Sequence, residues 1–395
     1  MSIAFIAALL SAYLNIPLID KFASIVSEVF INILKCISIP LIFFSIVGTI
    51  SSMDNVSEFK RLGSKVIKYT LLTTFIAAFV ALAMFLMIDP VRSQIYLATT
   101  PATGVATTEG GYLTYFIGII PSNAIAPFVE NRVISVLFLA LLSSLAILSL
   151  PIEHRTPLRS LFSSLYAMIM KIATWIVTLM PIAIWSFVTL FFRDMRNGLE
   201  ISQLALYLSC VLAANLIQGL VVLPLFIKLK GLSPIALAKG MFPALSVAFF
   251  TKSSSATLPL AMRCAEENVG LSKRVTSFAF PLCTTINMNA CAAFILTTVL
   301  FVSMAHGIQY SAIDYFMWVV IASIAAVGNA GVPMGCYFLA SALLASMNVP
   351  LNLMGVILPF YAMIDMLETA LNVWSDSAVV AVVDSEVREE ITSPV

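Results

Sequence analysis

Long apolar stretches separated by short polar connections dominate the hydrophobic pattern of this chain. They cover residues 3–19, 23–50, 66–88, 112–121, 133–150, 161–192, 204–227, 278–304 and 355–383. A helix needs about 20 residues to cross the roughly 30 Å hydrocarbon core of a bilayer, and most of these stretches approach or exceed that length. The pattern predicts an all-α polytopic membrane protein, in which several helices are long enough to be tilted or broken.

Two further apolar segments, 243–265 and 318–345, have polar or helix-breaking residues at their centres. The first carries Thr-Lys-Ser-Ser-Ser at 251–255, and the second carries Gly-Asn-Ala-Gly-Val-Pro-Met-Gly at 328–335. Irregular backbone is tolerated at membrane depth only where protein or a wet cavity satisfies its polar groups. Each segment therefore predicts a re-entrant hairpin whose tip reaches the middle of the membrane.

Basic residues suggest opposite entry sides for the two hairpins. Lys and Arg gather in the loops near 60–68, 155–159, 228–239 and 263–274. If these loops are cytoplasmic, the first hairpin has its base in the cytoplasm and the second has its base outside. Each hairpin precedes a helix with polar residues at mid-depth, so the arrangement is that of an inverted repeat, which is typical of transporters.

The composition supports a single membrane domain. Hydrophobic residues make up 61% of the 395 residues and charged residues only 10%, with a net charge of +1, whereas soluble domains are about 25% charged. The absence of any basic run argues against a nucleic-acid partner. The six cysteines are scattered singly, without metal-ligand spacing, and predict free thiols and no resident cofactor.

The last apolar stretch contains three carboxylates, Asp365, Glu368 and Asp376. A charge at the centre of a bilayer costs about 2.5 to 3.5 kcal/mol on insertion scales, so such residues usually face a cavity with a function. At about 100° per residue, Thr369 and Asn372 share a helix face with Asp365 and Asp376, and Glu368 flanks it. The face predicts an ion and solute site inside the membrane.

A second polar cluster, Thr-Thr-Ile-Asn-Met-Asn at 284–289, lies within an otherwise apolar helix. It favours a helix that unwinds and offers oxygen ligands to a hard cation such as Na+, with Asp376 supplying the negative charge. The alternative is hydrogen bonding between helices.

The serine run and the first carboxylate each have a second interpretation. The hydroxyls and N–H groups at 253–255 suit a solute carboxylate, although a serine-rich loop explains them equally well. A Ser–Lys hydrolase dyad with Lys252 lacks any supporting motif. Asp365 suits a substrate ammonium group, and its alternative is a structural ion pair with Lys252.

Together these motifs resemble the glutamate and neutral amino-acid transporter family, the dicarboxylate/amino acid:cation symporters. The serine run followed by Ala-Thr-Leu-Pro at 256–259 resembles that family's first hairpin, Thr-Ile-Asn-Met at 285–288 its broken seventh helix, and Ala-Gly-Val-Pro at 330–333 its second hairpin. Asp365, Thr369, Asn372 and Asp376 match its eighth helix, and weaker similarity covers nearly the whole chain.

The resemblance implies eight transmembrane helices plus two re-entrant hairpins in a homotrimeric, elevator-type transporter of a cytoplasmic membrane. The scaffold subdomain would comprise about 1–62 and 112–200 and the transport subdomain about 63–96 and 201–384, with 385–395 as a cytoplasmic tail. The partners would be an amino acid, Na+ and the lipid bilayer.

The resemblance also implies site residues. Those at the amino acid would be Ser253, Ser254, Ser255, Cys291, Val332, Asp365, Glu368, Thr369 and Asn372. One Na+ site would use carbonyls of Cys283, Asn287 and Asn372 with the Asp376 carboxylate. Another would use carbonyls around Thr285 and Met288 and from Ala326 to Asn329, and a third would use Thr70, Thr73, Thr74, Asn287 and Asn289.

Departures from the family pattern bear on the substrate. Glu368 stands where members with acidic substrates have arginine, which turns attraction for a side-chain carboxylate into repulsion, and Cys291 replaces a common threonine. Acidic amino acids should bind poorly. Glu368 would contact a cationic side chain, be neutralised by Lys252 beside a neutral amino acid, or carry a coupled proton.

Two further departures bear on coupling. Asn289 replaces an aspartate and Thr70 a tyrosine at the third cation site. Loss of the charge that offsets Na+ desolvation predicts at most two Na+ per cycle, with H+ coupling left open. The alternative function is a relative that does not couple uptake to ions, acting as a solute receptor or an anion channel.

Overall fold

The computed structural model describes residues 6–11, 16–51, 62–91, 120–130, 132–196, 201–329 and 334–392. Every regular element within these ranges is helical, which confirms the all-α prediction. The helices are α2 (Pro17–Ser51), α4 (Ser64–Ile88), α6 (Ala126–Val129), α7 (Val133–Ser149), α8 (Ile152–Thr178), α9 (Met180–Arg196), α10 (Ile201–Ile217), α11 (Leu223–Leu229), α12 (Pro234–Thr251), α13 (Ser254–Cys264), α14 (Lys273–Ile286), α15 (Asn289–Ala305), α16 (Ala312–Val327), α17 (Gly335–Ser346) and α18 (Asn352–Thr392).

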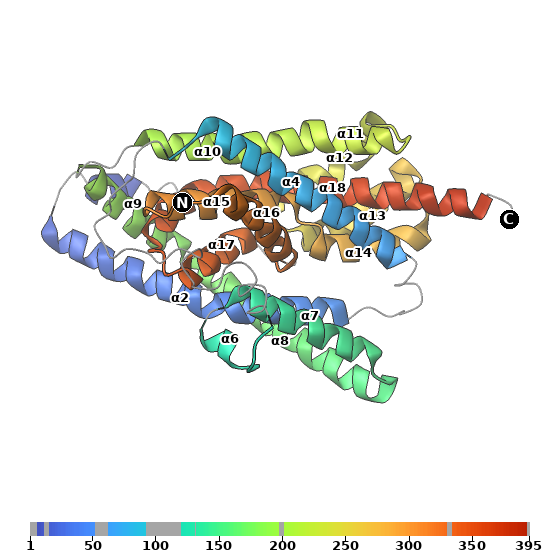
Figure 1. Ribbon diagram of the computed structural model, residues 1–395, viewed down its shortest axis with the longest axis horizontal. Helices are drawn as coiled ribbons and strands as arrows, with labels where there is room; N and C mark the ends of the chain where they lie inside the picture. Colours follow the sequence, from blue (N-terminus) through green and yellow to red (C-terminus); the bar gives the residue numbers. More distant parts are fainter. Residues whose placement is uncertain are drawn as a thin grey trace.

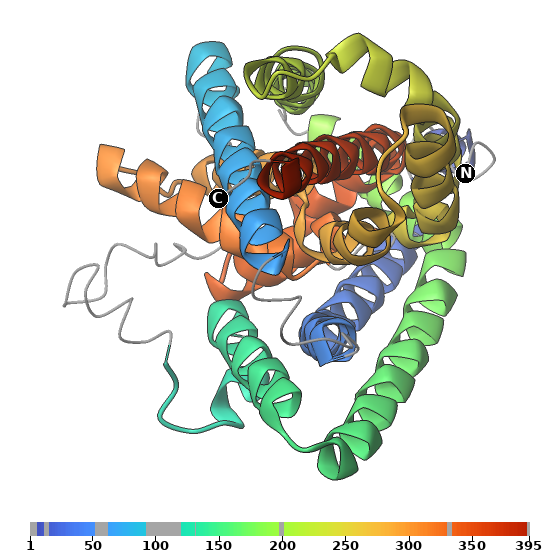
Figure 2. The same cartoon turned by 90° about the vertical axis from the view of Figure 1, so that its right-hand side faces the viewer.

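A first group of helices assembles around α2, which packs against α7, α8 and α9. In Figure 1 α2, α7 and α8 occupy the lower part of the molecule and α9 lies at the left, and in Figure 2 α7 and α8 diverge on either side of α2. Large apolar side chains such as Leu142, Leu161 and Trp175 remain exposed on α7 and α8. In a membrane protein such surface faces lipid or another chain.

A second group surrounds α15 and α18. α15 packs against α4, α16 and α17, and α18 packs against α12, α14 and α15. Almost every side chain of α15 is buried, and α18 crosses the centre of the molecule in Figure 1. The polar residues of α18 therefore lie inside protein, as their charge requires.

The two most extensive contacts between the groups in the described chain are those of α17 with α2 and of α18 with α9. At the second contact, a Cβ on Gly355 would lie 1.9 Å from a ring carbon of Phe187. Only the missing side chain of glycine allows the ring this close to α18.

The first predicted hairpin is a helix–turn–helix formed by α12 and α13. Lys252 ends α12 in the left-handed conformation with φ of 55°. The Ser253 hydroxyl then accepts a hydrogen bond from the Ala256 backbone N–H at 3.2 Å, which caps the start of α13. Because Ser253 is used as the cap, Ser254 becomes the first helical residue behind the turn.

The polar cluster at 284–289 interrupts a helix, as predicted. α14 ends at Ile286 and α15 begins at Asn289, and the residues between them, Asn287 and Met288, have ψ angles of 76° and 62°. The second hairpin is represented by α16 and α17. Its predicted tip at 330–333, which includes Val332, lies outside the described residues.

Some element bounds differ from the sequence pattern. The stretch 161–192 is divided between α8 and α9, and α18 continues to Thr392, through most of the predicted tail. Five helical segments of the described chain are long and apolar enough to span a bilayer: Ser64–Ile88, Gln203–Leu229, Pro234–Thr251, Lys273–Ala305 and Asn352–Arg388. The total of eight spans and the elevator movement stay predictions.

Candidate functional site

A small polar pocket lies where the first hairpin, the helix break and the second hairpin meet α18. It is lined by Lys252, Ser254, Met288, Asn329, Cys336, Asp365, Glu368, Thr369 and Asn372. Seven of these residues are among the predicted substrate or cation ligands that the resemblance implied. The fold thus brings together residues that are more than a hundred positions apart in the chain.

Two carboxylates of α18 converge on one tyrosine. The Tyr361 hydroxyl lies 3.4 Å from Asp365 Oδ1 and 3.2 Å from Glu368 Oε2. Asp365 is 6% exposed and Glu368 only 1% exposed. Glu368 Oε1 is buried and has no hydrogen-bond partner. An acceptor that is left unpaired in a polar pocket is suited to a donor on a ligand.

Farther along the same face of α18, the side chains of Thr369 and Asn372 each make one hydrogen bond to the described part of the protein. The Thr369 hydroxyl donates to the Asp365 carbonyl at 2.7 Å. The Asn372 amide oxygen accepts from the Ala290 backbone N–H at 3.0 Å, so it satisfies a free donor at the start of α15. The Thr369 lone pairs and the Asn372 amide nitrogen remain for a ligand.

Only one serine of the predicted run lines the pocket. Ser254 is 4% exposed and faces the pocket, whereas Ser253 caps α13 and Ser255 is exposed. The prediction that all three serines contact the substrate is thus supported by the pocket lining for Ser254 alone.

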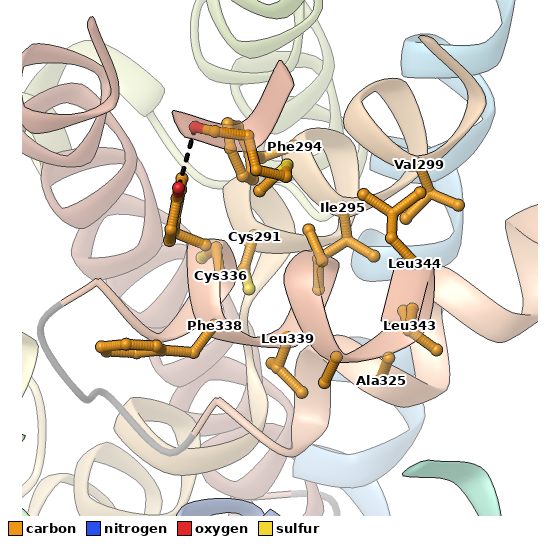
Figure 3. Packing of buried hydrophobic residues seen from close by; sticks show 14 of the residues in the cluster. Cys291, Phe294, Ile295, Val299, Ala325, Cys336, Phe338, Leu339, Leu343 and Leu344 are labelled. Carbon is orange, nitrogen blue, oxygen red and sulfur yellow. Dashed lines mark hydrogen bonds between the residues drawn. The ribbon is translucent and has the colours of Figure 1, made fainter. Parts of the chain in front are cut away.

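Cys291 lies behind the pocket and does not line it. It is fully buried, and its side chain lies beside that of Cys336 of α17. Figure 3 shows the two cysteines side by side within the apolar packing of α15 and α17. Cys336 is the sulfur that reaches the pocket.

The helix break forms a second polar cluster around Asp376, one turn beyond Asn372. Asp376 Oδ1 accepts from Asn287 Nδ2 at 3.0 Å, and Oδ2 lies 3.5 Å from the Thr284 hydroxyl. Asp376 is 1% exposed, and within the described chain no lysine or arginine lies within 4.0 Å of it. A buried carboxylate without a charged partner is strongly disfavoured, so the donor set fits a small cation such as Na+.

Neutral hydrogen bonds fill the predicted third cation site. Thr74 donates to Asn289 Oδ1 at 2.8 Å, and Asn289 Nδ2 donates to the Ser375 hydroxyl. Thr73 donates to Asn287 Oδ1 at 3.3 Å, while the buried hydroxyl of Thr70 has no partner. The Asn289 amide is thus satisfied at both ends without an ion.

Several predicted carbonyl ligands already accept backbone hydrogen bonds. Cys283 O accepts from Asn287 N at 2.8 Å, Met288 O from Ala292 N at 3.0 Å, and Ala326 O from Asn329 N at 3.0 Å. A carbonyl oxygen has a second lone pair, so these bonds leave room for a cation. The Thr285 side chain bonds its own helix through the Pro281 carbonyl.

Two residues that hold the site together were missed in the sequence. Tyr361 precedes Asp365 by four residues and Glu368 by seven, so helical periodicity alone would have placed it on their face. Ser375 accepts from both Asn287 and Asn289. Its position directly before Asp376 was the available signal.

The fold is that of a polytopic membrane protein, with a candidate solute pocket beside a candidate cation site at Asp376. The chain belongs to the sodium:dicarboxylate symporter family, whose model matches residues 1–386. It is 28% identical to a Caenorhabditis elegans protein provisionally named sodium-dependent excitatory amino acid transporter glt-4, over 92% of this chain and 83% of the relative. It is 27% identical to human neutral amino acid transporter B(0), over 89% of this chain and 71% of the relative.

It is also 25% identical to the proton/glutamate-aspartate symporter of Escherichia coli K12, over 93% of this chain and 85% of that protein. These relatives are transporters rather than enzymes, and their names include neutral and acidic amino acids and both sodium and proton coupling. The protein is therefore a multi-pass membrane protein of this transporter family.

Proposed function

We propose that the protein is a cation-coupled symporter, driven by Na+ or by H+, that takes up neutral or cationic amino acids in preference to acidic ones. The observation that carries the proposal is the buried pair Asp365 and Glu368 in one pocket. Asp365 binds the α-ammonium group of the substrate, and Ser254 with the Asn372 amide binds its carboxylate. A substrate with an acidic side chain would meet Glu368, and two carboxylates about 4 Å apart repel each other strongly even at an effective dielectric near 20.

Coupling follows from the position of Asn372 between the two sites. Its oxygen holds the first N–H of α15 in place, and Asp376, one turn farther on α18, holds Asn287 at the other end of the break. A cation at Asp376 favours one geometry of the Asn287–Met288 break. That geometry positions Asn372 for the substrate, so each ligand raises the affinity for the other by the same factor.

The mobile part in this proposal is the group around α15 and α18, with the site inside it, and the scaffold is the group around α2. The contacts of α17 with α2 and of α18 with α9 form the sliding surface. Exposed apolar side chains on α7 and α8 are suited to lipid or to neighbouring chains in a homotrimer, and the protein would work in the cytoplasmic membrane.

At most two Na+ accompany each substrate in this proposal. Replacement of Asn289 by aspartate should therefore create a new dependence on cations, because aspartate cannot donate to Ser375 and leaves a buried charge. We expect the variant to be destabilised by about 2 kcal/mol without Na+ and to recover at high Na+. Thermal unfolding measured against Na+ concentration tests this, with the exposed Asn268→Asp as control. A wild-type stoichiometry of three Na+ per substrate would contradict the proposal.

The second candidate function is a receptor or anion channel that binds a solute without coupled uptake. The hydrogen-bonded Asn289 network favours it, since a cation site of the family pattern is replaced by neutral contacts. The buried, uncompensated Asp376 argues against it, because a site that binds no cation has no reason to retain an unpaired charge.

A thermal-shift screen of the purified protein tests the proposed function. Acidic, neutral and cationic amino acids are each added in Na+, in choline at pH 7 and in choline at pH 5. A ligand at a hundred times its dissociation constant stabilises the folded state by about 2.7 kcal/mol. We expect cation-dependent shifts with neutral or cationic amino acids. A shift with aspartate alone would reject the role of Glu368, and shifts independent of both Na+ and pH would favour the receptor.

A further inference from the structure

One buried acceptor in the pocket is not used by the fold. Glu368 Oε1 has no hydrogen-bond partner, although the side chain is only 1% exposed. Its other oxygen lies 3.2 Å from the Tyr361 hydroxyl. Glu368 is among the residues that line the pocket. Neutral weak donors at the other oxygen do not compensate a buried carboxylate.

Lys252 does not provide the missing cation. No ion pair within 4.0 Å joins Lys252 to Asp365 or to Glu368, all of which lie in the described part of the chain. Its electrostatic influence falls on Asp365, while the charged neighbour of Glu368 is Asp365 itself. The Lys252 ammonium group thus acts more strongly on the charge of Asp365 than on the charge of Glu368.

The formal charge of the pocket identifies the class of ligand. Two carboxylates and one ammonium group line it, which leaves one negative charge. The backbone of an amino acid adds no net charge, because its ammonium and carboxylate groups cancel. A neutral substrate would leave the negative charge buried, an acidic one would double it, and a basic one would cancel it. Cancellation is the favoured case in a site that excludes water.

The spacing of the two carboxylates agrees with this class. Asp365 and Glu368 are three residues apart on α18, and Cβ atoms at that separation are about 5 to 6 Å apart on one helix face. The two cationic groups of a basic amino acid are separated by only a few methylene groups. One molecule can therefore place its α-ammonium at Asp365 and its side-chain cation at Glu368.

We propose that Glu368 is the specificity-determining residue for a cationic side chain, so that the substrate is a basic amino acid with a side-chain ammonium or guanidinium group. The inference rests on the proposed symport of amino acids and deepens it. The substrate carboxylate lies toward Ser254 and Lys252 at the first hairpin, and the side-chain cation donates the hydrogen bond that Glu368 Oε1 lacks. Tyr361 orients both carboxylates.

Uptake into proteoliposomes under a Na+ gradient tests the proposal, with lysine, ornithine and arginine compared with alanine, serine and aspartate. We expect the apparent KM of the best basic amino acid to be at least tenfold lower than that of alanine. Each basic molecule should also carry one more positive charge than alanine does, measured as charge moved per substrate. Glu368→Gln should lower the selectivity for basic amino acids over alanine, measured as the ratio of their kcat/KM values, at least tenfold.

One control variant and one measurement on the unmodified protein separate an effect on specificity from an effect on folding. Glu267→Gln makes the same substitution at a side chain that is 60% exposed on the hairpin surface, and it should change neither KM. If Glu368→Gln does not fold, the selectivity and the charge per substrate of the unmodified protein still decide the question.

Other outcomes are distinct. Na+-driven uptake of alanine without uptake of basic amino acids would overturn this inference and leave the proposed function intact. Proton uptake with alanine that disappears in Glu368→Gln would also overturn it, because Glu368 would then be a proton site. The absence of cation-dependent uptake or binding of any amino acid would instead reject the proposed function.

Discussion

Substitution of Asp376 by asparagine is expected to remove Na+-dependent substrate binding and uptake. Asparagine keeps the size of the side chain and one acceptor for Asn287, but it removes the one carboxylate at the helix break. Without that charge, nothing offsets the desolvation of a cation there. We expect the apparent Na+ affinity to fall at least a hundredfold, which corresponds to about 2.7 kcal/mol. Na+ titrations of thermal stability and of amino-acid uptake measure the effect.

The matched control is Asp314→Asn. Asp314 belongs to a capping box at the start of α16 and accepts from the Ser311 backbone N–H at 2.6 Å. Its substitution should lower stability by about 1 kcal/mol and leave the Na+ dependence unchanged. If Asp376→Asn binds amino acids with unaltered Na+ dependence, the cation lies elsewhere. If amino-acid binding by the unmodified protein and by Asp314→Asn does not depend on Na+ but depends on pH, the coupling ion is H+.

Substitution of Asp365 by asparagine is expected to abolish amino-acid binding while Na+ binding survives. The substrate ammonium group would lose its charged acceptor, whereas the Tyr361 hydroxyl would keep an oxygen to donate to. Removing one partner of a buried charge pair costs about 3 to 5 kcal/mol, so we expect a loss of substrate affinity of at least a hundredfold. Isothermal titration with the preferred amino acid and, separately, with Na+ measures the two affinities.

The two substitutions are expected to lower the affinities for two different ligands, the amino acid and Na+. Asp365 has its bonds in the pocket and Asp376 at the helix break, so one variant should lose the substrate and the other the ion. Equal loss of both affinities in Asp365→Asn would indicate that the helix break has collapsed. Unaltered amino-acid affinity would show that the ammonium group binds elsewhere and would also remove the basis for the role of Glu368.

Charged and polar residues within apolar stretches can be recognised from the sequence, because placing each of them in the hydrocarbon core of a bilayer costs free energy. The carboxylates of α18, the polar break at 284–289 and the serine-rich turn were located in this way. The roles of individual atoms were not. The sequence could not show that the Ser253 hydroxyl caps α13 while Ser254 faces the pocket. These two roles depend on the residue at which the turn ends and α13 begins.

Local pattern thus sufficed for the all-α class, the helix–turn–helix of the first hairpin and the interrupted helix, because periodicity, length and helix breakers act within a few turns of chain. Tertiary packing determined which side chains meet. The donation from Asn289 to Ser375 and the capping of α15 by Asn372 join elements far apart in sequence. The same packing leaves one buried oxygen of Glu368 without a partner. Hydrogen bonds of this kind depend on distances of a few ångströms between helices, which only the packed fold sets.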